Sequence, residues 1–137
     1  MSFETVKTKI MFNKVFPLFF ILISFNTASQ DKTAKIKTLL NNDELDKAEK
    51  EINFVFKADS LSLDYLLLRS KLEWKRGNYL SASKYYERIM PIDSAKACNG
   101  MAILHSLNRE YKTSLKYINT AIRLDRNNID YFNNRAN

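Results

Sequence analysis

The chain has 137 residues, which is the size of one domain, and a hydrophobic fraction of 45%. Only two Gly and two Pro are present, which argues against a β-sandwich or barrel with many tight turns and favours helices joined by short polar turns. The formal net charge is +7, but basic and acidic residues are interspersed. We therefore expect solvated helix faces and no nucleic-acid surface, which would need clustered basic residues.

Residues 1–29 are predicted to be a secretory signal peptide of the bacterial type. Three lysines and one glutamate lie within residues 1–14, an uncharged apolar run covers residues 15–25, and small residues precede Gln30. We expect cleavage before Gln30, with Met11 as an alternative start, and export to the periplasm or the exterior. An uncleaved membrane anchor is the alternative, although the run is shorter than the roughly 20 residues of a spanning helix. A mature chain that begins at Gln30 would favour export.

Two similar segments occur in the chain: GNYLSASKYYERI over residues 77–89 and REYKTSLKYINTAI over residues 109–122. Upstream, Leu45, Ala48 and Ile52 have the same mutual spacing as Tyr79, Ala82 and Tyr86. A period of roughly 30 residues indicates a stacked-repeat solenoid. We expect units of about 29–62, 63–94 and 95–128, and a partial unit 129–137.

Each unit is predicted to contain two helices with different faces. The second helices, around residues 48–56, 82–90 and 114–122, carry apolar residues at intervals of three and four, which indicates one buried face. The first helices, around 63–74 and 97–107, are apolar on several sides, as expected for helices packed between two neighbours. Ser62 and Ser94 are the predicted helix caps, and Pro91 is expected to end the helix before it. Cys98, the only cysteine, excludes an intrachain disulfide and is expected to be a packed helix residue.

This pattern resembles the tetratricopeptide repeat (TPR) family. Ser70 and Ala102 stand where the family has a small residue midway along the first helix, whereas Ile36 fits that position poorly. The family's Gly, aromatic and small residues at the start of the second helix correspond to Gly77, Tyr79 and Ala82, with Arg109 in place of the glycine in the third unit. The resemblance covers about residues 31–137. It implies an all-α fold, a right-handed α-solenoid of antiparallel helix pairs in a TPR domain over residues 30–137.

The resemblance also implies a concave groove, lined by the first helices, that binds a protein or a peptide. The candidates carried over by position are Thr33, Lys37, Leu40, Asp64, Leu67, Lys71, Trp74, Lys75, Lys96, Asn99, Ile103 and Ser106. Trp74 has the large apolar area and single donor of a binding hot spot, but it could equally pack between units. The family's carboxylate-binding pattern is only partly present, in Lys71, Lys75 and Asn99.

Catalytic chemistry is not expected. His105 is the only histidine and has no Cys or carboxylate cluster near it in sequence, so it offers no metal site. The acidic group of Asp43, Glu44 and Asp46 brackets a helix start, where acids favour the helix dipole. We predict a non-catalytic scaffold without cofactor or metal. The alternative is an amino-terminal part of a larger membrane-anchored TPR sensor or regulator.

The last residues, NIDYFNNRAN, are expected to open the first helix of a fourth unit, with Tyr131 and Phe132 as its first apolar residues. Leu115, Ile118 and Ile122 would then have only this short helix to cover them. Each large apolar side chain left in water forfeits about 1.5 to 3 kcal/mol of burial. We therefore expect a truncated product, or an end that docks on a partner or on a second copy of the chain.

Overall fold

A computed structural model describes residues 32–136 of the chain. The chain divides into two compact units, Met1–Lys35 and Ile36–Asn137. In the first unit the described residues 32–35 are helical. The predicted signal peptide lies outside the described residues, and it therefore remains a prediction.

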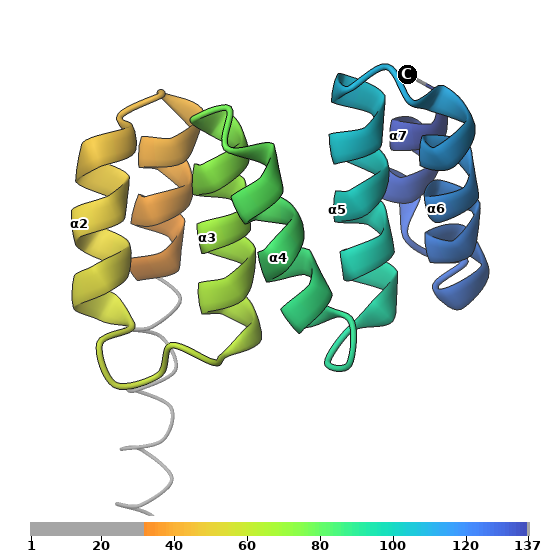
Figure 1. Ribbon diagram of the computed structural model, residues 1–137. Helices are drawn as coiled ribbons and strands as arrows, with labels where there is room; N and C mark the ends of the chain where they lie inside the picture. The colour runs from red at the N-terminus through yellow and green to blue at the C-terminus, as the bar shows by residue number, and fades with distance from the viewer. Residues whose placement is uncertain (1–31, 137) are drawn as a thin grey trace, which may run out of the picture. The chain divides into compact units, whose positions relative to one another are not determined.

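The second unit is built from helices joined by short turns (Figure 1). The helical residues 36–41 come first, followed by α2 (Leu45–Val55), α3 (Leu63–Lys75), α4 (Tyr79–Ile89), α5 (Ser94–Leu107), α6 (Tyr111–Leu124) and α7 (Ile129–Ala136). Residues 32–136 contain no strand, so the predicted all-α class is confirmed for this part of the chain. Within the same residues, no helix has the length and apolarity needed to cross a bilayer.

Three turns in this unit share one backbone geometry. Asp43, Gly77 and Arg109 have φ values of 58°, 79° and 61°, in the left-handed region. The amide that follows each of them donates to a carbonyl in the last turn of the preceding helix, over 2.9, 2.8 and 2.8 Å respectively. This is the Schellman ending of a helix, which favours glycine because a Cβ is strained there. The three turns recur at the interval of the sequence repeat, so the sequence period is also a structural period.

The helix ends agree with most of the predicted caps and helix-ending residues. Ser62 is the N-cap of α3, and its hydroxyl accepts a hydrogen bond from the Tyr65 amide. Pro91 follows the end of α4, as predicted. The predicted cap at Ser94 is wrong by one position: Asp93 accepts from the Lys96 amide at 3.0 Å, and the Ser94 hydroxyl donates to the Met90 carbonyl.

The core consists of three clusters, and each draws buried side chains from three successive helices. The first joins residues 36–41, α2 and α3 through Ile36, Leu40, Ala48, Ile52, Phe56, Leu68 and Leu72. The second joins α3, α4 and α5 through Leu66, Ala82, Tyr86, Ile89, Ala97 and Leu104. The third joins α5, α6 and α7 through Ala95, Cys98, Ala102, Ile118, Ala121 and Tyr131. The helices α3 and α5 therefore each serve two clusters, which explains why they are apolar on more than one side.

The short carboxyl-terminal helix α7 contributes to the third core cluster. Tyr131 of α7 is buried in the third cluster together with Ile118, and Ile122 packs against that cluster. Ile118 and Ile122 are therefore covered, with α7 as the short helix expected there, and the docking of this end on a partner or a second copy remains a prediction. Leu115, by contrast, is 49% exposed, and Phe132 remains 39% exposed.

Candidate functional site

Helix α3 presents two polar stripes on opposite faces. Successive residues of an α-helix are about 100° apart around the axis, so positions separated by two residues point about 200° apart. Lys71 and Lys75 form one stripe, and Arg69 and Glu73 form the other, displaced by two positions. The two faces of α3 can therefore form two different polar sites.

The first stripe, together with Lys37 and Trp74, forms a surface that we call the lysine face. Burial, followed by the positive charges of Lys75 and Lys37, lowers the pKa of Lys71 below its ordinary value. The Lys71 ammonium thus experiences repulsion from both Lys75 and Lys37. The Lys71 ammonium donates to the Asn41 side-chain oxygen at 2.8 Å, and Lys75 pairs with Asp43.

Trp74 is half-buried beside these lysines. Its inner side packs against the second core cluster. The Lys75 ammonium lies 5.8 Å from the centre of its ring, a cation–π distance. Trp74 therefore packs between helices, one of its two predicted roles, while its role as a binding hot spot remains a prediction.

The remaining groove candidates are less well placed to contact a bound peptide. Lys96 pairs with Asp93 at the start of its own helix, and Asn99 accepts a hydrogen bond from the Asn134 amide group at 2.8 Å. Leu40 is fully buried, so the expectation that it lines a groove is wrong. Asp64 is exposed in the first turn of α3. Thr33, Leu67, Ile103 and Ser106 complete the set, and each is half-buried.

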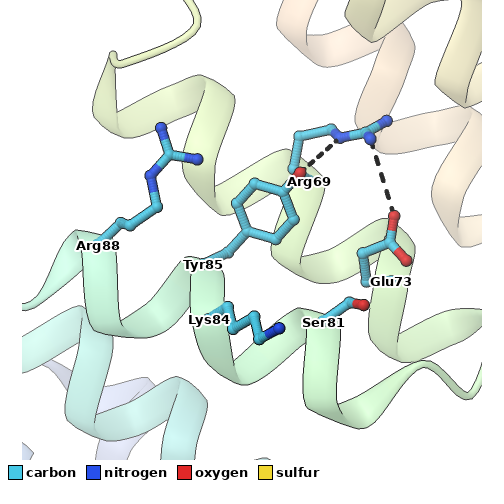
Figure 2. A pocket seen from close by; sticks show the side chains of 6 residues that line it. All are labelled: Arg69, Glu73, Ser81, Lys84, Tyr85 and Arg88. Atoms are coloured by element: carbon cyan, nitrogen blue, oxygen red, sulfur yellow. Dashed lines mark hydrogen bonds and ion pairs between the residues drawn. The ribbon is translucent and has the colours of Figure 1, made fainter.

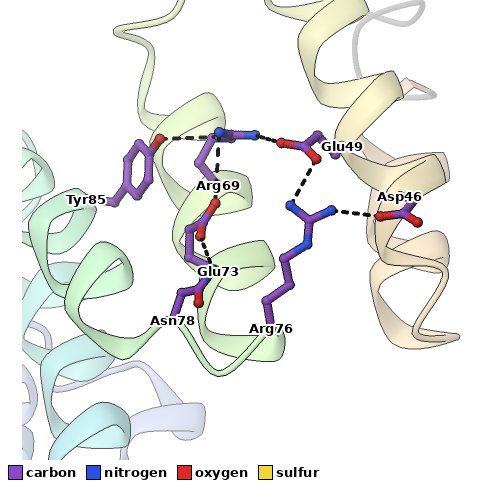
Figure 3. Close-up of polar contacts among 7 residues, drawn as sticks. All are labelled: Asp46, Glu49, Arg69, Glu73, Arg76, Asn78 and Tyr85. Atoms are coloured by element: carbon purple, nitrogen blue, oxygen red, sulfur yellow. Dashed lines mark hydrogen bonds and ion pairs between the residues drawn. The ribbon is translucent and has the colours of Figure 1, made fainter.

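The second stripe belongs to a network that links α2, α3 and α4, shown in Figure 3. The Arg69 guanidinium lies 3.0 Å from Glu49, 3.9 Å from Glu73 and 3.3 Å from the Tyr85 hydroxyl. Arg76 adds contacts of 2.9 Å to both Glu49 and Asp46. We call these residues, with Asn78, the arginine network.

The arginine network is well satisfied electrostatically. Burial lowers the pKa of Arg69, but hydrogen bonds with Tyr85 and Glu49 outweigh it, so the pKa lies above its ordinary value. Hydrogen bonds from Arg69 and Arg76 lower the pKa of Glu49. The ion pairs of Glu49 with Arg69 and Arg76 therefore stay charged at neutral pH.

Arg69 and Tyr85 also line an open pocket of about 460 Å³ on the α4 side of the network (Figure 2). Its other lining residues are Glu73, Ser81, Lys84 and Arg88. We call it the Tyr85 pocket. Lys84 and Arg88 were not singled out from the sequence. The signal that could have revealed the pocket was Arg69 itself, a charged residue that directly follows the apolar run of residues 66–68.

Among residues 32–136, no group of three or more His, Cys, Asp or Glu is arranged to hold a metal ion. Cys98 is buried, as predicted, and burial raises the pKa of its thiol. No family model matches the chain, and no curated protein matches it either.

Proposed function

We propose that this chain folds as a right-handed α-solenoid of the tetratricopeptide type, with antiparallel helix pairs as its units. Two observations support this proposal. The left-handed turns at Asp43, Gly77 and Arg109 recur at the sequence period. Each core cluster is also shared by a helix pair and the first helix of the next pair, which is how stacked repeats cover one another.

On this architecture, the protein is a non-catalytic scaffold that binds a protein or peptide segment across its lysine face. The observation that carries the proposal is the Lys75 ammonium 5.8 Å from the ring centre of the half-buried Trp74, together with the effect of the Lys75 and Lys37 charges on Lys71. Asp43 is the one acid that pairs with these lysines among the described residues. A partner carboxylate would relieve the repulsion among the ammonium groups, and an apolar side chain could pack on the indole.

The preferred partner is therefore a segment that carries acidic residues next to an apolar one. If residues 1–29 are a signal peptide that is cleaved during export, this scaffold lies in the periplasm or the exterior. Retention of those residues would tether the same scaffold to a membrane.

Trp74 is the only tryptophan of the chain, so its fluorescence reports on this face. The probe is a fluorescein-labelled octapeptide with Glu residues on both sides of a Leu, together with a counterpart that has Gln for Glu. We expect saturable binding of the acidic peptide in fluorescence anisotropy and a change in Trp74 emission. The Gln counterpart and Lys71→Ala should each weaken binding by about tenfold, because hydrogen bonds to charged groups are the stronger ones.

The matched control is Lys116→Ala, which removes an exposed lysine from α6 and should leave the affinity unchanged. If the wild-type chain binds neither peptide, or if Lys71→Ala binds as tightly as wild type, the lysine face is not the binding surface.

A further inference from the structure

The Tyr85 pocket lies on the face of α3 that points away from the lysine face, so it is a candidate for a second, separate site. Its volume of about 460 Å³ falls within the roughly 300 to 1,000 Å³ of small-molecule sites. Figure 2 shows Arg69, Lys84 and Arg88 arranged on different sides of the Tyr85 ring. The guanidinium carbons of Arg69 and Arg88 lie 5.9 and 5.7 Å from the centre of that ring.

Several donors in the pocket are uncommitted. Arg69 donates to the Tyr85 oxygen, so the hydrogen of the Tyr85 hydroxyl is left to be donated to another group. Within residues 32–136, neither Lys84 nor Arg88 forms an ion pair with an acid. Arg88 makes only a long contact, 3.5 Å, to the Ser60 carbonyl in addition to its ring contact.

The one acid in the lining does not cancel these charges. One oxygen of Glu73 accepts from the Asn78 amide at 3.0 Å, and the other faces Arg69 at 3.9 Å. Its side chain is only 11% exposed. The three cationic side chains and one carboxylate give the lining a formal charge of +2. Because Glu49, outside the lining, pairs with Arg69, the cations left without an acid are Lys84 and Arg88.

The following helix pair does not repeat this arrangement. At the corresponding positions of that pair, Met101 replaces Arg69, Thr120 replaces Arg88 and His105 replaces Glu73. Tyr117, which replaces Tyr85, stacks on His105 with ring centres 5.2 Å apart. The cationic pocket is therefore a property of one helix pair and is not required by the scaffold.

We propose that the Tyr85 pocket binds a phosphate or sulfate group, either as the free anion or as the ester of a small organic molecule. Lys84 and Arg88 neutralise the charge, while the Tyr85 and Ser81 hydroxyls donate to the anion's oxygens. A tetrahedral oxyanion has terminal oxygens pointing in several directions, which suits donors that approach from different sides. The size of the pocket leaves room for the organic part of an ester.

The experiment is a calorimetric titration of the full chain with inorganic phosphate, inorganic sulfate and phenyl phosphate, each at matched ionic strength with chloride as the reference. We expect saturable binding of the oxyanions above the chloride background. Lys84→Ala combined with Arg88→Ala should weaken it by about tenfold or more. Both residues are exposed and alanine is a good helix former, so the variant is expected to fold, and circular dichroism checks this.

Two control variants separate this site from the rest of the surface. Lys116→Ala removes the lysine equivalent to Lys84 from the next pair, and Lys71→Ala removes a cation from the lysine face; both should bind the oxyanions as wild type does. Tighter binding of phenyl phosphate than of phosphate identifies an ester as the ligand class, and equal binding identifies the free anion. The proposal fails if no oxyanion binds above chloride, if the double variant binds normally, or if Lys71→Ala or Lys116→Ala abolishes binding.

Discussion

Arg109 holds a backbone conformation that suits glycine better. Its φ of 61° is left-handed, whereas the equivalent turn of the preceding helix pair has Gly77 at 79°. For a residue with a Cβ, the left-handed conformation costs about 1 to 2 kcal/mol. The third helix pair thus carries local strain that the second avoids.

We expect Arg109→Gly to stabilise the fold by about 0.5 to 1 kcal/mol. The gain is smaller than the strain because glycine also gives the unfolded chain more freedom. Urea denaturation followed by circular dichroism measures the change. The matched variant is Gly77→Ala, where the added Cβ meets no atom within 4 Å, so that any loss is conformational. Equal stability of Arg109→Gly and wild type would show that the turn at this position is not strained.

At the scale of helices, the contact of α4 with α5 depends on a large residue facing a small one. A Cβ on Gly100 would lie 2.1 Å from the Tyr86 ring, well inside van der Waals contact. Tyr86 is only 6% exposed, so its ring has little room to move. In the preceding interface the equivalent pair is Ile52 and Leu68, both within the first core cluster. The same space is thus filled by two medium side chains in one interface and by tyrosine with glycine in the next.

We expect Gly100→Ala to destabilise the fold by about 1 to 3 kcal/mol, which is typical of an overpacked core. In a Tyr86→Leu background the same change should cost much less, because the ring that it meets is gone. Thermal unfolding of the four members of this double-mutant cycle measures the difference. An equal cost in both backgrounds would mean that the Tyr86 ring does not limit the approach of the two helices.

The arginine network makes the contact of α2 with α3 sensitive to acid. Hydrogen bonds from Arg69 and Arg76 lower the pKa of Glu49 below its ordinary value of 4.5. A carboxyl group with a lower pKa in the folded chain stabilises the fold above its unfolded pKa, and the stabilisation is lost as pH falls through the folded value. Glu49 therefore contributes at neutral pH and ceases to contribute in acid.

We expect the free energy of unfolding to decrease between about pH 5 and pH 2, and the decrease to be smaller in Glu49→Gln. Glu87→Gln, on the exposed face of α4, is the control and should retain the wild-type pH dependence. Urea titrations at several pH values provide the measurement. If Glu49→Gln follows the wild-type curve, the ion pairs of Glu49 do not stabilise the fold.

The sequence predicted the elements better than it predicted the sites. Recurring apolar positions and the turn at Gly77 mark helix ends, because those signals are local in the chain. The cap at Asp93 was missed because α5 begins one position earlier in its repeat than α3 does, which shifts the cap relative to Ser62. Arg69 forms hydrogen bonds with Glu49 and Tyr85, which lie 20 and 16 residues away in the sequence, and no local pattern reveals such pairs. The lysines at 71 and 75 were predictable because helical spacing alone puts them on one face.

For the second unit as a whole, the three core clusters have α3 and α5 in common. Each cluster joins only neighbouring helices, and no cluster reaches from one end of the chain of helices to the other among the described residues. Its stability is then close to a sum of local terms and nearest-neighbour terms. Changes in one interface, such as that of Gly100 with Tyr86, should leave the first cluster largely intact.

The sharing of α3 and α5 also has a mechanical consequence. A pulling force on the two ends of this unit would load the terminal helices first, because each core cluster ties together only successive helices. Peeling α7 away removes Tyr131 from the third cluster and loosens α6 while leaving α5 attached to the second. Extension in an optical trap would therefore proceed as a series of small steps from the ends inward, without one large rupture.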